Sequence, residues 1–244
     1  MQAFIDKNKR KGYYIYMISD IFNNTSGGEK EGAVEKLISQ STPTIDFFLM
    51  VALSVFMAAF GLLIDSSAIV IGAMLIAPVL YPLLSSSMGI VMFNKKLIRL
   101  SLTTLLKSIA VGIGAAFIVG IFFGSKEALL ANEIMSRTSP SLIDAAIAVV
   151  AGFAASFALV KPKLSETLPG IAISVSLVPP LAVTGLGLAF FDGAIIRGSL
   201  LLFFVNVIGI MFASVFVFSA MNFYIKRGAA TQAIKKEEKE EHMI

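Results

Sequence analysis

Two groups of proline and hydroxyl-bearing residues interrupt long apolar stretches of the chain. The first group comprises Pro78, Tyr81, Pro82, Ser85 and Ser86, and the second comprises Ser174, Ser176, Pro179, Pro180 and Thr184. A proline lacks its N–H and clashes with the carbonyl four residues earlier, so a helix that passes through either group loses hydrogen bonds. In hydrocarbon, the freed carbonyls must be satisfied by protein, water or a bound solute. These residue types therefore indicate a polar site within an apolar environment.

The two proline groups predict two broken helices. We expect the carbonyls of Met74, Pro78, Val175 and Ser176 to lose their helical partners. New helix N-termini near residues 82–85 and 180–184 would carry partial positive charge, and discontinuous transporter helices use such ends to bind anionic groups. The alternative is a pair of proline kinks whose carbonyls are capped by Ser, Thr and neighbouring helices.

Two further polar residues lie within apolar stretches. Lys107 is the ionisable residue deepest in such a stretch, which makes it a candidate for solute binding. Its alternative role is to extend along the helix back to the membrane interface. Asn206 is a second candidate, and its alternative role is a hydrogen bond between helices.

Charged residues also stand at the starts of apolar stretches. Asp46 and Asp144 are expected to cap helix N-termini, with a coupling-ion site as the alternative. Arg99 and Arg197 are expected to anchor helices at the interface, with guidance of the solute as the alternative.

The composition argues against catalytic chemistry. The chain has no Cys and a single His, His242, and no Asp or Glu lies at the middle of an apolar stretch. We therefore predict no catalytic residues, no metal site, no cofactor and no enzyme activity. A proton-driven antiporter with a buried carboxylate is unsupported, whereas sodium held by carbonyl and hydroxyl oxygens remains open.

The elements that must position these residues are membrane helices. Hydrophobic residues make up 57% of the 244 residues, and the mean hydropathy is +0.85, well above that of a soluble domain. Six stretches reach the roughly 20 residues that a bilayer requires. They lie at about 45–64, 68–93, 100–123, 143–160, 168–191 and 198–222.

A repeat at an offset of 98 residues relates the first three stretches to the last three. It aligns Pro82, Gly89 and Ser101 with Pro180, Gly187 and Ser199. Because each copy holds an odd number of stretches, the second copy must enter the membrane from the opposite side, as in many transporters. The fold class predicted is an all-α polytopic membrane protein of two inverted three-helix repeats, with its second and fifth helices broken at prolines.

Positive charge predicts the orientation and the domains. All Lys and Arg residues except Lys107, Lys126, Arg137 and Arg197 lie in residues 1–43, 94–99, 161–167 and beyond 225. Such an excess marks cytoplasmic segments, so both termini are expected in the cytoplasm. The predicted domains are a cytoplasmic segment (1–43), the first repeat (44–124), an external connection (125–141), the second repeat (142–222) and a cytoplasmic charged tail (223–244).

The run GLLIDSSAIVIGAMLIAP at residues 61–78 resembles the signature of domain of unknown function 389 (DUF389), the "uncharacterised hydrophobic proteins" of prokaryotic membranes. The resemblance covers about residues 44–222. It implies an integral protein of the plasma membrane of a bacterium or archaeon, and it supplies no catalytic residues.

The sequence favours a secondary transporter whose site lies at mid-membrane between the broken helices. The positive helix ends and the lack of buried acids suggest a small anionic or zwitterionic solute. An ion channel and a non-transporting structural or sensory membrane protein are the alternatives. The expected partners are the lipid bilayer, the solute and a second copy of the chain, with small residues allowing close helix contact in a dimer; no nucleic-acid partner is expected.

Overall fold

The computed structural model describes residues 26–161, 164, 167–168 and 177–241, and the regular elements of this part of the chain are helices. Four helices are long and apolar enough to cross a membrane: α3 (Ile45–Leu63), α6 (Lys95–Phe123), α8 (Leu142–Val160) and α11 (Gly193–Ala220). The other helices are α2 (Gly27–Ser39), α4 (Ser67–Ile76), α5 (Leu80–Val91), α7 (Asn132–Met135), α10 (Val178–Ala189) and α12 (Arg227–Glu241), with short 3₁₀ turns η1 (Ala128–Leu130) and η3 (Phe223–Lys226).

Helices α4 and α5 occupy the second predicted span, and they are bent by 51° at the short break between them. Taken as one bent span, the pair would be a fifth crossing. The fifth predicted span, 168–191, is described only at its start and as the short helix α10.

Two long helices start earlier than the hydropathy pattern predicted. Starts near residues 100 and 198 were expected, whereas α6 begins at Lys95 and α11 at Gly193. In both helices a side-chain oxygen sets the start: Asn94 accepts from the backbone N–H groups of Lys96 and Leu97, and Asp192 does the same for Ala194 and Ile195. These caps satisfy amides that no helical carbonyl can reach, so the charged first turns remain helical although they are too polar to count as a span.

Local structure recurs at the 98-residue offset. The bounds of α5 and α10 correspond position by position, and Phe93 and Phe191 both take the left-handed conformation that ends the preceding helix. The next residue donates its N–H to the carbonyl of Gly89 in one copy and of Gly187 in the other, at 3.0 and 2.9 Å. Both glycines are required by space, because a Cβ there would lie 2.9 Å from an isoleucine side chain of the next helix.

The short helices α5 and α10 lie inside the protein, while the long ones face outwards. Almost every residue of α5 from Pro82 to Gly89, and of α10 from Val178 to Gly187, is buried. Helix α11 instead exposes large apolar side chains at intervals of three and four residues: Leu201, Phe204, Ile208, Phe212 and Phe216. A stripe of this kind on the outside of a helix suits contact with lipid.

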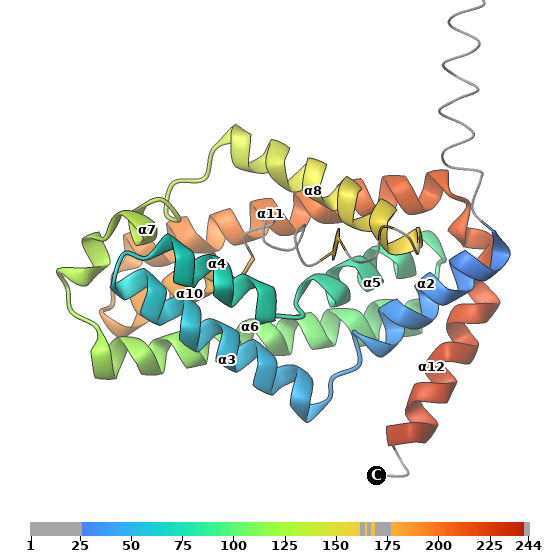
Figure 1. Cartoon of the computed structure of the whole chain (residues 1–244), viewed down its shortest axis with the longest axis horizontal. Helices are drawn as coiled ribbons and strands as arrows, with labels where there is room; N and C mark the ends of the chain where they lie inside the picture. The colour runs from blue at the N-terminus through green and yellow to red at the C-terminus, as the bar shows by residue number, and fades with distance from the viewer. Residues whose placement is uncertain (1–25, 162–163, 165–166, 169–176, 242–244) are drawn as a thin grey trace, which may run out of the picture.

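The two ends of the molecule differ in charge. Helices α2 and α12 lie side by side at one end, and α7 lies at the other (Figure 1). At the end that carries α2 and α12, Lys226 of η3 forms a 2.6 Å ion pair with Glu31 of α2. The side-chain amide of Asn94 donates to Thr231 of α12 at 3.5 Å. The basic turn at the start of α6 therefore lies at the same end as α2 and α12.

Candidate functional site

Pro78 lies in the short break between α4 and α5. Helix α4 ends at Ile76 and α5 begins at Leu80, so Pro78 lies between them and Pro82 lies in the first turn of α5. A proline is well tolerated in a first turn because the missing N–H would have no helical partner there. The carbonyl of Pro78, expected to lose its partner, accepts the N–H of Tyr81 at 3.3 Å.

The second proline group stands at the start of α10. Pro179 and Pro180 lie in its first turn, and the helix begins at Val178. Both helix starts, Leu80 and Val178, thus precede the ranges 82–85 and 180–184 that the sequence indicated. Ser174, Val175 and Ser176, which the sequence placed before this break, lie outside the described residues.

The two interrupted regions meet inside the protein. Residues from both line one cavity, which encloses about 10 Å³, close to the minimum for a single water molecule. The described residues of its lining are apolar: Met74, Ala77, Val79, Leu80, Leu177 and Val178. The starts of two helices, and with them the partial positive charge of their first turns, therefore converge on one small space.

The hydroxyl groups next to this junction hydrogen-bond to the protein. The Ser86 hydroxyl donates to the Leu83 carbonyl at 2.8 Å. Ser85 accepts a 2.8 Å hydrogen bond from the hydroxyl of Ser101 on α6, whose own second contact is the Leu97 carbonyl at 2.9 Å. The Ser101–Ser85 bond fastens α5 to α6 within an otherwise apolar contact.

A corresponding hydroxyl pair joins α10 to α11. Thr184 and Ser199 lie 2.8 Å apart, and Thr184 also donates to the Pro180 carbonyl at 2.8 Å. Sequence reasoning aligned Ser101 with Ser199 but assigned neither a role. Only the recurrence of Ser101 and Ser199 was visible in the sequence, because their partners do not correspond: Ser85 aligns with Val183, and Thr184 aligns with Ser86.

The remaining candidate residues lie apart from the hydroxyl pairs. Tyr81 is half-buried against the apolar core. Asn206 is buried on α11, where it is engaged in an interaction. Lys107 is exposed on α6 and so does not join the junction, which favours the role of a side chain that extends to the interface.

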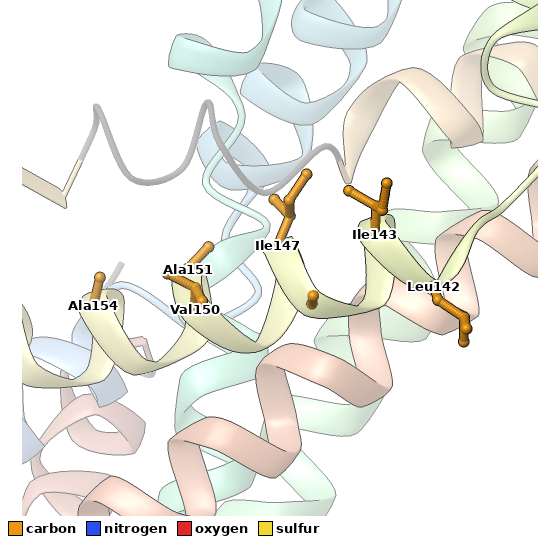
Figure 2. Close-up of a pocket in the computed structure, with 7 residues that line it drawn as sticks. Leu142, Ile143, Ile147, Val150, Ala151 and Ala154 are labelled. Atoms are coloured by element: carbon orange, nitrogen blue, oxygen red, sulfur yellow. The ribbon is translucent and has the colours of Figure 1, made fainter.

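A second, larger hollow of about 510 Å³ lies along α8. Figure 2 shows Ile143, Ile147 and Ala151 pointing to one side of the helix along this hollow. Its described lining is wholly apolar, and it offers no polar group that could orient a solute. Such a surface suits lipid chains or another apolar helix rather than a polar ligand.

A polar network closes the end of the molecule that carries α7. The carboxylate of Asp65 accepts the backbone N–H of Glu133 at 2.8 Å and the side-chain amide of Asn132 at 3.0 Å. These hydrogen bonds, the backbone one first, hold the pKa of Asp65 below its ordinary value. Glu133 also accepts from the Ser67 hydroxyl and from Arg137, so the network ties the α3–α4 connection to α7.

Within the part of the chain that the structure describes, no group of His, Cys, Asp and Glu side chains could hold a metal ion.

Comparison with known proteins gives a family relationship without an activity. Residues 74–212 match the family described as "Domain of unknown function (DUF389)". An uncharacterised protein of Methanocaldococcus jannaschii is 33% identical over 174 residues, which is 70% of this chain and 53% of that protein. The chain thus spans about half the length of this curated relative. No solved structure matches the chain.

Proposed function

The chain belongs to the DUF389 family, and from the convergence of its interrupted helices we propose that it is an integral membrane secondary transporter of a small solute. The observation that carries this proposal is the cavity shared by the α4–α5 break and the start of α10. The solute binds there, at mid-membrane, between two broken spans.

We further propose an inverted three-plus-three arrangement of six spans, which would be consistent with this placement. The described helices that fall in each half of the repeat would be α3, α4–α5 and α6, and α8, α10 and α11. In such an arrangement the broken helices of the two halves face each other across the membrane centre, which is where transporters of this build bind their solutes.

The lining restricts the kind of solute. Prolines at 82, 179 and 180 remove backbone donors from the first turns of α5 and α10, while the helix dipoles remain. The described side chains around the cavity are apolar. These features suit a small anionic or zwitterionic solute with an apolar body, whose charged group lies at the helix ends.

The non-transporting alternative has a specific observation in its favour. The hydroxyls of Ser86, Ser101 and Thr184 are paired within the protein, and the cavity is barely large enough for water. A transporter with this structure would be in an occluded state, and it must open at the junction to admit a solute. A structural or sensory protein would not open there.

The proposed orientation in the membrane and the proposed neighbours follow from the charge distribution and from the exposed apolar side chains. The basic end with α2 and α12 faces the cytoplasm of a prokaryotic cell, following the positive-inside rule. The outer faces of α3, α6, α8 and α11 contact lipid, and close contact through the α8 hollow would accommodate a second copy of the chain.

Flux measurements on purified protein in liposomes test the transport proposal. A panel of labelled small carboxylates and amino acids is offered, and we expect saturable uptake of at least one of them. Ala77→Trp fills the cavity and should abolish that uptake. Ala110→Trp is the matched control, because Ala110 is exposed on α6, and it should transport like the unmodified protein.

Two outcomes would count against the proposal. Ohmic, non-saturating current under voltage clamp would indicate a channel. Absence of flux for the whole panel, with Ala77→Trp as stable and as well folded as the Ala110→Trp control, would favour the non-transporting alternative.

A further inference from the structure

A third hollow lies at the basic end of the molecule, and its lining differs from that of the cavity at the helix junction. It encloses about 270 Å³ between the start of α6, the α2–α3 connection and α12. Its described lining combines cations, hydroxyls and apolar groups: Thr42, Pro43, Lys96, Arg99, Leu100, Thr103, Ile234 and Glu237.

The cations of this pocket lie along one face of α6. Lys96, Arg99 and Thr103 follow at intervals of three and four residues, so they share a side of the helix. Lys107 continues the same face one turn deeper and is exposed. Helix α6 carries no acidic residue between Lys95 and Phe123, so the acidic groups that balance its cations come from other elements, such as Glu237 of α12 in the pocket lining.

The length of α6 places the pocket at the membrane surface. Its 29 residues span about 43 Å at 1.5 Å per residue, whereas the hydrocarbon core is about 30 Å thick. The first turns, which hold Lys96 and Arg99, must therefore extend into the headgroup layer. Lys107 lies about 12 Å further along the axis, and its long side chain can extend back towards that layer.

We propose that this pocket binds the headgroup of an anionic phospholipid in the cytoplasmic leaflet, of the phosphatidylglycerol type. The inference rests on the membrane placement proposed above and adds a ligand at a site separate from the solute cavity. Lys96 and Arg99 neutralise the phosphodiester, and the hydroxyl of Thr103 lies in the same lining to donate to it. The Thr42 hydroxyl donates to the Ile38 carbonyl at 3.0 Å instead.

The other lining residues select among lipids. Leu100, Pro43 and Ile234 supply apolar contact for the glycerol backbone and the first acyl carbons. The carboxylate of Glu237 can accept from the headgroup hydroxyls. Two cations, Lys96 and Arg99, and one carboxylate, Glu237, line the pocket, so a net negative lipid is favoured over a zwitterionic one.

Lipid binding is measured on the full chain in detergent by native mass spectrometry and thermal shift. The probes are phosphatidylglycerol, phosphatidylcholine and inorganic phosphate. We expect retained phosphatidylglycerol and a raised melting temperature with that lipid, and neither effect with phosphatidylcholine or phosphate. The double variant Lys96→Gln/Arg99→Gln should retain at least fivefold less phosphatidylglycerol.

The control uses the repeat partner of Arg99. Arg197 occupies the corresponding place at the start of α11, where its Nε donates to the Gly193 carbonyl at 2.9 Å. Arg197→Gln should bind phosphatidylglycerol like the unmodified protein. Thr103→Phe, at an exposed position in the pocket lining, obstructs the pocket without removing charge and should also reduce binding.

Three results would overturn the assignment. These are equal retention of phosphatidylglycerol by the double variant and by Arg197→Gln, equal retention of phosphatidylcholine, or a thermal shift with inorganic phosphate as large as that with the lipid. Because no flux is measured, the result is independent of whether the protein transports a solute.

Discussion

The buried hydroxyls of this protein act first as fasteners between helices. Thr184 with Ser199 and Ser85 with Ser101 each span two helices at 2.8 Å, and each hydroxyl of α6 or α11 also donates to a carbonyl of its own helix. A hydroxyl in such a place has an energetic role even when no solute is bound. In variants at these positions, a loss of stability therefore reports the lost helix contact, whereas a loss of solute affinity reports a role in solute binding.

Thr184→Val should destabilise the protein without a direct effect on a solute. Valine keeps the shape but removes the bond to Ser199, and a buried hydrogen bond of this kind contributes about 1 kcal/mol. Ser85→Ala on α5 should have an effect of similar size. Thermal unfolding in detergent measures both, and a lowered solute affinity with an unchanged melting temperature would show instead that the Thr184 hydroxyl faces the solute.

The Asp65 network predicts a dependence on pH at the α7 end. The pKa of Asp65 is lowered from its ordinary value of 3.8 by hydrogen bonds to the ionised carboxylate. Its stabilising contribution is therefore complete above pH 3.8 and is lost as the pH falls through the lowered value. The protection factor of the Glu133 amide against hydrogen exchange, which corrects for the intrinsic effect of pH on the rate, should fall in that range.

Asp65→Asn is the matched variant for this prediction. Asp65 has a positive φ of 55°, which asparagine tolerates well, so the backbone turn is kept while the titration is removed. The protection factor of the Glu133 amide should then be insensitive to acid. An equally steep acid dependence in Asp65→Asn would assign the effect to another group.

At the scale of the elements, close contact between helices depends on glycine. A Cβ at Gly152 of α8 would lie 2.7 Å from the Ile210 backbone of α11, and one at Gly185 of α10 would lie 2.5 Å from the Ile113 carbonyl of α6. The nearest neighbour of each Cβ is a backbone atom, which cannot yield as a flexible side chain does. Gly152 therefore sets the distance between α8 and α11, and Gly185 sets the distance between α10 and α6.

Gly152→Ala should lower the stability by about 1–3 kcal/mol, because the added methyl group forces α8 away from α11. Gly114→Ala is the matched control on α6, where a Cβ would meet nothing within 4 Å. It should be neutral or slightly stabilising, since alanine is the better helix former. Equal melting temperatures for the two variants would contradict this account of the contact.

The sequence predicted the elements unevenly, and the reasons are physical. Hydropathy located the long apolar helices, since each is an uninterrupted apolar run. It placed the starts of α6 and α11 about five residues late, because Asn94 and Asp192 cap turns that are charged. Pro78 lies between α4 and α5, whereas Pro82, Pro179 and Pro180 lie within first turns rather than before them, so α5 and α10 begin at Leu80 and Val178.

Partnerships between elements could not be predicted in this way. The pairing of Ser101 with Ser85 depends on the turn around Phe93, whose left-handed conformation sends α6 back along α5. The exposure of Lys107 likewise depends on the rotation of α6 about its axis. A lysine within an apolar run implies a free-energy cost of placing its charge in the membrane, but it does not show which way the side chain points.

At the scale of the whole molecule, the two ends carry different chemistry, and this predicts an orientation. Since the chain has no Cys, single cysteines can be introduced and labelled from either side of the membrane. Gly228→Cys lies at the end with α12, and Ser125→Cys lies in the connection after α6. In intact cells, a membrane-impermeant maleimide should label only Ser125→Cys, and labelling of Gly228→Cys alone would reverse the orientation.

The most direct test of a solute site between the interrupted helices is the water accessibility of Ala77. Ala77→Cys is reacted with a small charged thiol reagent in membranes, with Ala110→Cys on the lipid-facing side of α6 as control. We predict that Ala77→Cys reacts, that a transported solute slows the reaction, and that Ala110→Cys stays unreactive. An Ala77→Cys thiol as inert as the control, in every solute condition, would contradict a solute site at the junction.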